Sequence, residues 1–148
     1  MPNIFVKIPK GVASSNQLDA MVAGITDAAC EAESIPDNPR QRAMTWVMVE
    51  EVEAANVYLG GNKVVPAMIP VVVQIFPPEG VLDAKRREGQ AKKVAEAVHT
   101  ALGEEAEKVL VSCMMLDVPD GTWGVNGAIW TLPDFAKAAG YEHLQDAN

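Results

Sequence analysis

The chain has 148 residues, of which 49% are hydrophobic and 22% are charged, and its formal net charge at pH 7 is −8. These values predict one globular unit with a sizeable core. No apolar run is long enough to span a bilayer. The start lacks the basic and apolar regions of a secretory signal. We therefore expect a cytoplasmic protein without a membrane partner, and the acidic balance argues against nucleic acid, because phosphates are bound by a basic face.

The first half of the chain reads as a strand, a helix and a strand. Residues 2–8 are rich in β-branched and aromatic residues and are followed by proline and glycine, which predicts a strand. A serine–glutamine capping box and apolar residues at helical spacing predict a helix from Ser14 to about Glu33. Residues 34–42 contain two prolines and are expected to form a loop. Residues 44–52 are predicted to form the second strand, and residues 56–62 a turn or short hairpin.

The second half repeats this order. Residues Val71 to Phe76 predict a strand that is stopped by prolines and a glycine. A helix is predicted from Asp83 to Leu102, because apolar residues recur on one stripe and a glycine follows as a C-cap. Residues 109–116 predict a strand, and residues 122–130 close this half with a turn, as residues 56–62 close the first.

Two such units predict an α/β (α+β) fold, in which two tandem β-α-β units form a four-stranded sheet with two helices on one face. The whole chain, residues 1–148, is expected to be a single domain, with units at 2–66 and 70–132 and a C-terminal tail at 133–148. Each strand–helix–strand connection should give a parallel pair. The other face of the sheet would be open, and its apolar side chains suggest oligomerisation: Met44, Trp46, Met48 and Met114.

The order of a proline behind methionine, a short strand, a glycine, a helix, a second strand and a GG turn resembles the tautomerase superfamily. Its members carry the β-α-β unit singly, as in 4-oxalocrotonate tautomerase, or doubled, as in cis-3-chloroacrylic acid dehalogenase. The stretch TWVMVEEVEAANVYLGG is similar to the first half of the dehalogenase type, and WGVNG is similar to the F-G-x-G-G turn of single-unit members. The resemblance covers residues 2–132 and implies a homotrimer that works without a cofactor.

The resemblance also implies that Pro2 is the catalytic residue. Removal of Met1 would give Pro2 a secondary amine at the chain terminus. An ordinary α-amino group titrates near ~7.7–8.0, and burial lowers that value because it disfavours the ammonium form. A neutral amine is a good general base for a proton next to a carbonyl, and its protonated form can act as the acid. If Met1 persists, the Pro2 nitrogen is an amide and has no basic lone pair.

The cationic partners of the superfamily are missing from the matching positions. Its arginines fall on apolar residues or proline here, and the helix histidine of the dehalogenases falls on alanine: Val12, Trp46, Pro78, Val81 and Ala29. The pocket should therefore take a less charged and more apolar substrate than a dicarboxylate. Alternatively, the chain could borrow a cation from elsewhere: Arg40, Arg42 or Lys7.

Five further residues are candidates for the substrate pocket. Trp46 and Trp123 could form apolar walls, although core or interface packing is the more common use of tryptophan. Asn56 and Tyr58 precede the GG turn and could donate hydrogen bonds to a substrate carbonyl, although asparagine is also a common turn residue. Arg40 could bind an anionic group, although a solvated surface position explains it as well.

No other constellation points to a cofactor or a metal. Cys30 and Cys113 are expected to be buried small hydrophobes, and no Cys/His cluster accompanies them. His143 lies in the tail and is expected to be exposed to solvent.

The sequence therefore predicts a cofactor-independent keto–enol tautomerase that uses the Pro2 amine on a small carbonyl acid. One alternative is a cofactor-free dehalogenase or hydratase, which needs a carboxylate to activate water and arginines to hold the acid. The other alternative is a non-catalytic binding or assembly protein with the same fold, and retention of Met1 would favour it.

Overall fold

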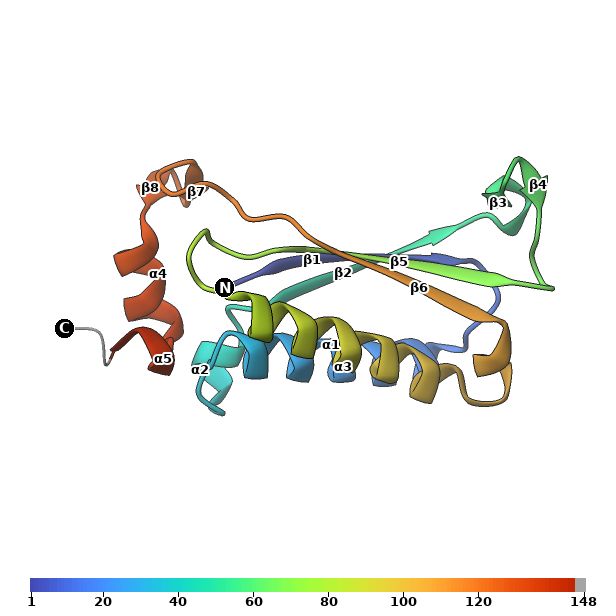
Figure 1. The fold of residues 1–148 in the computed structure, drawn as a ribbon, viewed down its shortest axis with the longest axis horizontal. Coiled ribbons are helices and arrows are strands. Elements are labelled where there is room, and N and C mark those ends of the chain that lie inside the picture. The colour runs from blue at the N-terminus through green and yellow to red at the C-terminus, as the bar shows by residue number, and fades with distance from the viewer. Residues whose placement is uncertain (146–148) are drawn as a thin grey trace.

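The computed structural model describes residues 1–145 and is built around one four-stranded sheet (Figure 1). The strand order is β2-β1-β5-β6, with β1 (Asn3–Pro9), β2 (Trp46–Val52), β5 (Ile69–Phe76) and β6 (Val109–Met115). The two outer pairs, β1–β2 and β5–β6, are parallel, and the central pair, β1–β5, is antiparallel. This is the arrangement that two tandem β-α-β units require, and it confirms the predicted fold class.

Two long helices, α1 (Ser15–Ala32) and α3 (Ala84–Leu102), lie side by side on one face of the sheet (Figure 1). Each helix begins where the sequence predicts. The Ser14 side chain accepts from the Gln17 backbone N–H in a full capping box, and the Asp83 side chain caps the first turn of α3. A Cβ on Gly24 would lie 2.7 Å from that of Ala97, so a glycine permits the close approach of the two helices.

The main core lies between the sheet and these helices. Alternate residues of each central strand point toward the helices and are buried, as a period of two requires. In β5 the alternation is complete over eight residues. The strand side chains pack against the apolar stripes of the helices, and the central members of the cluster are Ile4, Val6, Val73, Ile75, Ile25 and Val94.

Each unit is closed by a small hairpin. The first contains β3 (Tyr58–Leu59) and β4 (Asn62–Lys63), preceded by the short helix η1 (Ala54–Asn56). The second contains β7 (Trp123–Val125) and β8 (Ala128–Trp130). A 3-10 helix, η2 (Gly103–Lys108), leads into β6. The hairpins lie at opposite ends of the molecule, and the chain N-terminus lies at the β7–β8 end (Figure 1).

Two segments differ from the prediction. Residues 34–42, expected to be a loop, contain the short helix α2 (Pro39–Arg42), because the Asn38 side chain caps it and proline fits its first turn. The predicted tail is a structured part of the fold: α4 (Leu132–Ala139) and α5 (Glu142–Gln145) pack beside the N-terminus. Residues 146–148 of that tail lie outside the described residues.

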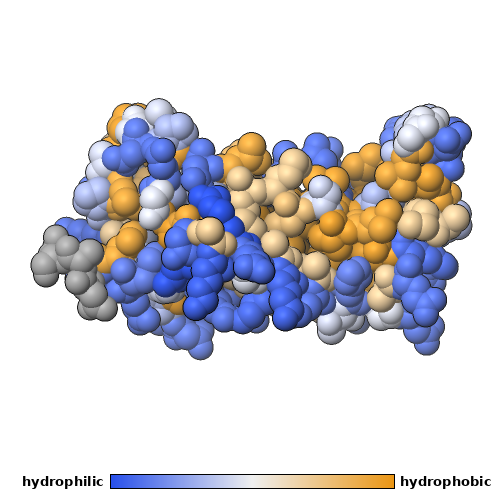
Figure 2. Space-filling model, viewed as in Figure 1, coloured by the Kyte–Doolittle hydropathy of each residue, from blue (hydrophilic) through white to orange (hydrophobic). Residues whose placement is uncertain are grey.

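The sheet face away from the helices is open and apolar. Several large side chains on or near it are exposed: Trp46, Met48, Leu110, Met114 and Leu116. In Figure 2 apolar surface gathers along the sheet side, whereas the helical side is mostly hydrophilic. Within residues 1–145, no helix combines the length and the apolar character needed to cross a membrane.

Candidate functional site

The chain amino terminus is buried inside the protein and faces two polar side chains. Met1 is only 4% exposed, and its ammonium nitrogen lies 2.7 Å from Oε2 of Glu33. The same ammonium donates to the hydroxyl oxygen of Tyr141. Chain termini usually lie at the surface, where water solvates the charge. The burial of a terminal ammonium beside a carboxylate and a phenol is therefore unusual.

Glu33 reaches this position because α1 ends there. It is the C-cap residue of α1, and its backbone N–H donates to Ala29 O at 3.0 Å. Ile25, Ala29 and Glu33 follow one another at intervals of four residues, so they lie on one face of the helix and the carboxylate continues its buried stripe. Arg86 of α3 holds this helix end, since its Nη1 donates to Ala32 O at 2.7 Å and to Ser34 Oγ at 2.8 Å.

Tyr141 reaches this position because α4 and α5 fold back over the N-terminus. Phe135 of α4 anchors them, and its ring centroid lies 5.0 Å from that of Trp123 and 5.3 Å from that of Trp130. Helix α4 ends at Gly140 in a left-handed conformation, with φ of 71°, which glycine adopts without a Cβ penalty. The backbone N–H of Glu142 then donates to Ser34 O at 3.1 Å and ties α5 to the end of α1.

Burial shifts the ionisation of the terminal amine and of the Tyr141 phenol. It lowers the pKa of the Met1 ammonium below its ordinary value of 8.0, and the Glu33 carboxylate opposes that shift. Burial, reinforced by the negative charge of Glu33, raises the pKa of the Tyr141 phenol, so this hydroxyl stays protonated at neutral pH. Oε1 of Glu33 is buried and has no hydrogen-bond partner among the described residues. The carboxylate therefore has one free acceptor.

We call the space around Met1 the N-terminal chamber. Met1 belongs to a buried apolar cluster that joins α1, the segments before α2 and α3, and the C-terminal helices: Cys30, Ala32, Ile35, Val81, Leu82, Phe135 and Ala139. Consecutive Cα atoms lie about 3.8 Å apart, so the buried Pro2 is directly beside this chamber. Loss of Met1 would empty the chamber and leave the Pro2 amine at its edge.

A second hollow, of about 300 Å³, is lined by Asn3, the residue after Pro2, on the open face of the sheet. Its walls include Phe5, Phe76 and Trp123, with Asn3 and Thr122 as polar members. Asn3 follows Pro2 directly, and its buried Oδ1 has no hydrogen-bond partner within residues 1–145. The hollow is therefore mostly apolar and offers one free acceptor close to Pro2.

The structure brings two of the predicted pocket residues close to Pro2. Trp123 lines the hollow beside Asn3 and packs against the cluster that contains Met1. Trp46 is paired with Asn3 across β1 and β2, and its backbone N–H donates to Pro2 O at 3.1 Å. The Trp46 side chain is 54% exposed on the open face, so it does not enter the N-terminal chamber.

The other predicted pocket residues are not placed at Pro2 by this chain. Asn56 and Tyr58 follow the carboxyl end of β2, which runs parallel to β1, and therefore lie at the far end of the sheet (Figure 1). Seven strand residues separate the two ends by about 20 Å. Arg40 is exposed on α2, where it lines a surface hollow with Trp130 and Asp134.

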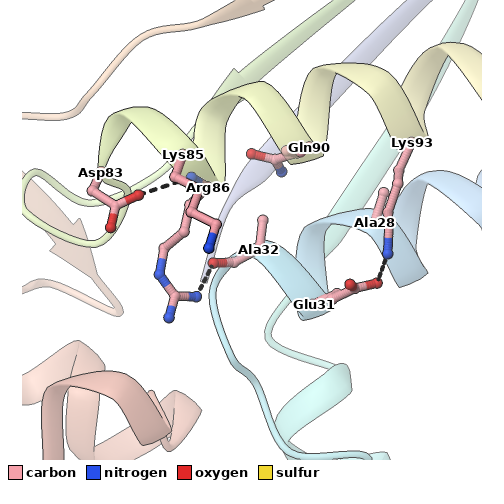
Figure 3. Close-up of a pocket in the computed structure, with 9 residues that line it drawn as sticks. Ala28, Glu31, Ala32, Asp83, Lys85, Arg86, Gln90 and Lys93 are labelled. Carbon is pink, nitrogen blue, oxygen red and sulfur yellow. Dashed lines mark hydrogen bonds and ion pairs between the residues drawn. The ribbon is translucent and has the colours of Figure 1, made fainter.

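A groove of about 420 Å³ between α1 and α3 offers a rival location for a ligand (Figure 3). Gln90 is buried there, and its side-chain amide has no partner among the described residues. Two of the flanking cations are engaged, because Lys93 pairs with Glu31 and Arg86 holds the end of α1, whereas Lys85 makes no ion pair among the described residues. The groove shares Ala32 with the cluster around Met1, but Met1, Glu33 and Tyr141 do not line it, so it lacks the amine, carboxylate and phenol of the N-terminal chamber.

Sequence reasoning missed the residues that surround the amine. Glu33 could have been found, because a carboxylate that continues an apolar helical stripe must be buried or paired. Tyr141 lies 140 residues from Met1, and no periodicity links them.

The expectation for His143 is wrong: it is half-buried, and its Nε2 lies 2.9 Å from Val81 O, because α5 packs against the loop before α3. Cys30 is buried as expected.

The structure is similar to solved structures of the tautomerase superfamily. A fused 4-OT, the F6 wild-type asymmetric trimer, is 21% identical, with a TM-score of 0.69 over 86% of this chain and 94% of its own. N1, a member of the cis-3-chloroacrylic acid dehalogenase (cis-CaaD) family, is 15% identical, with a TM-score of 0.69 over 99% and 91%. Macrophage migration inhibitory factor of Toxoplasma gondii is 13% identical, with a TM-score of 0.64 over 86% and 99%.

These similarities confirm the predicted resemblance at the level of the fold: the chain has the fold of the tautomerase superfamily. No protein-family model matches the sequence, and neither does any curated protein. Fused 4-OT structures include both symmetric and asymmetric trimers, so similar folds assemble into oligomers.

Proposed function

We propose that this protein is a cofactor-independent enzyme of the tautomerase type, in which Met1 has been removed and the Pro2 amine transfers protons. The observation that supports the proposal is the burial of the chain terminus beside Glu33 and Tyr141. Perturbed ionisable groups that converge in an enclosed site are typical of catalysis. The amine, the carboxylate and the phenol provide a base, a proton carrier and a hydrogen-bond donor.

The proposed step converts an enol to its ketone. The Pro2 ammonium gives its proton to the substrate carbon, while the enol hydroxyl loses its proton to Glu33. Glu33 then returns that proton to the Pro2 amine, so that the enzyme regains its starting state. Tyr141 remains protonated and donates a hydrogen bond to the substrate oxygen, which stabilises the developing enolate character.

Two measurements test this proposal together. Intact-protein mass spectrometry should give the mass without Met1, and purified protein should accelerate enol ketonisation. Pro2→Ala should lower kcat by roughly 10²–10⁴-fold, because a positioned general acid–base contributes that much. Pro39→Ala, at the exposed first position of α2, is the control and should leave the rate unchanged. An unchanged rate in Pro2→Ala, or full activity in protein that retains Met1, would refute the mechanism.

A second candidate function is hydration or dehalogenation. The free Oε1 of Glu33 favours it, because a buried carboxylate next to an ammonium could activate a water molecule. An arginine to hold an acidic substrate is the missing part, since Arg42 pairs with Asp27 at 2.5 Å and Arg86 holds the end of α1. Halide release from a 3-haloacrylate that depends on both Pro2 and Glu33 would support this candidate over tautomerisation.

A homotrimer forms part of the proposal. The open sheet face exposes Trp46, Met48, Leu110 and Met114, and burial of such a patch would favour association. The trimeric state of fused 4-OT structures supports the same arrangement. Asn56 and Tyr58, which lie far from Pro2 in their own chain, would then be available to the site of a neighbouring copy.

A further inference from the structure

We propose that the substrate of this site is an uncharged, apolar carbonyl compound and not a carboxylic acid. This inference rests on the proposed function, because it concerns the molecule on which the Pro2 amine acts. It is carried by the lining of the N-terminal chamber and by the charge already inside it.

The lining of the chamber fits an apolar group. Met1 occupies the space now, and its side chain is an unbranched, apolar thioether. It belongs to the same buried apolar cluster as Ile35, Val81, Leu82 and Phe135. Removal of Met1 would free apolar space next to Glu33 and Tyr141. A substrate that fills this space must bring an aliphatic or aromatic chain with its carbonyl group near the polar end.

The charge inside the chamber excludes a second anion. Glu33 is 0% exposed, and its negative charge is balanced by the single positive charge of the terminal ammonium. A substrate carboxylate would add an anion a few Å from Glu33 without a matching cation. At an effective dielectric constant of about 20 and a separation of about 6 Å between the two carboxylates, this repulsion weakens binding by roughly a hundredfold.

The nearby arginines make no ion pair with Glu33 among the described residues. Arg42 is paired with Asp27 and Asp37 on the surface, whereas Arg86 keeps its charge but directs its guanidinium to Ala32 O and Ser34 Oγ at the end of α1. The charged side chain that acts on the terminal amine is Glu33, an anion, whereas burial raises the pKa of the Cys30 thiol and keeps that group neutral.

The free polar atoms near Pro2 suit a neutral substrate. Glu33 Oε1 and Asn3 Oδ1 are both buried acceptors without partners among residues 1–145. An enol hydroxyl can donate to such an acceptor, whereas a carboxylate has only acceptors to offer. The adjoining hollow adds apolar surface from Phe5, Phe76 and Trp123. The site therefore suits a neutral enol, because the enol hydroxyl can donate to one of these acceptors and the molecule brings no second negative charge.

A matched pair of substrates tests the inference. The enol of methyl phenylpyruvate and the enol of phenylpyruvate differ at one group, which is a neutral methyl ester in the first and a carboxylate in the second. We expect kcat/KM for the ester to exceed that for the acid by roughly a hundredfold. Glu33→Gln should narrow this ratio by at least about tenfold, because it removes the repelling charge. Glu31→Gln, an exposed carboxylate on the same helix, is the control and should leave the ratio unchanged.

The outcomes separate the two proposals. Equal or higher kcat/KM for the acid, with both rates still dependent on Pro2, would overturn the inference and leave proton transfer intact. A ratio that Glu33→Gln does not change would also overturn it, because the discrimination would then have another source. If neither substrate reacts faster than with Pro2→Ala, the proposed function fails and the inference fails with it.

Discussion

Replacing Tyr141 tests whether the C-terminal helices are part of the fold at the N-terminus. The Tyr141 side chain is fully buried, and its hydroxyl accepts from the Met1 ammonium. Loss of a buried aromatic ring costs about 3–5 kcal/mol. In protein that retains Met1, loss of the hydroxyl also leaves the buried ammonium short of one partner, at about 1–3 kcal/mol. We therefore expect Tyr141→Ala to lose about 4–8 kcal/mol, a large share of the about 5–15 kcal/mol of a typical domain. Tyr141→Phe should lose only the hydroxyl part.

Urea unfolding followed by tryptophan fluorescence measures this loss, and a thermal scan should show Tm lowered by roughly 10–20 °C in the alanine variant. The other tyrosine of the chain provides the matched control. Tyr58 is 53% exposed on the β3–β4 hairpin, so Tyr58→Ala should cost less than about 1 kcal/mol. A cost below about 1 kcal/mol for Tyr141→Ala would show that α5 does not pack on the terminus in solution.

Three further predictions concern the rest of the structure. Asp83→Ala removes the N-cap of α3 and should lower the free energy of unfolding in urea by about 1 kcal/mol. Asp19→Ala, at an exposed position of α1, should leave it nearly unchanged, and equal losses in the two variants would contradict the capping role. Leu110→Asp on the open face should convert the proposed trimer to monomers in light scattering, while Asn16→Asp on the helical side should leave the assembly intact. Burial raises the pKa of Cys113 to about 11, so its alkylation by iodoacetamide should rise with pH toward that value; a midpoint at the ordinary 9.0 would show an exposed thiol.

The paired units could be predicted from the sequence because their signals are local. The strands alternate between buried and half-buried residues, and the caps at Ser14 and Asp83 mark the helix starts. Parallel pairing then follows from the handedness of β-α-β connections. The same reasoning also places Asn56 and Tyr58 far from Pro2. Because β1 and β2 are parallel, whatever follows β2 lies at the opposite end from the start of β1.

The site was less predictable because its groups come from distant parts of the chain. The Thr131–Asp134 capping box could have revealed α4, and the residue after it, Phe135, could have indicated a buried face. Nothing in the local pattern shows that Tyr141 returns to Met1, since that contact depends on how α4 and α5 pack on the second hairpin. The burial of Glu33 could have been predicted, because this residue ends an apolar helical stripe. Its partner could not, because helical periodicity gives no information on where the chain terminus lies.

The ionisation of the Pro2 nitrogen tests the account most directly. The chain has 10 prolines, and only a proline at the mature N-terminus has a nitrogen that can titrate. In protein labelled with ¹⁵N-proline, NMR should show one proline nitrogen whose shift changes with pH. Glu33→Gln should lower its pKa, because the carboxylate favours the ammonium form. If no proline nitrogen titrates, or if its pKa does not respond to Glu33→Gln, the proposed amine–carboxylate pair does not exist.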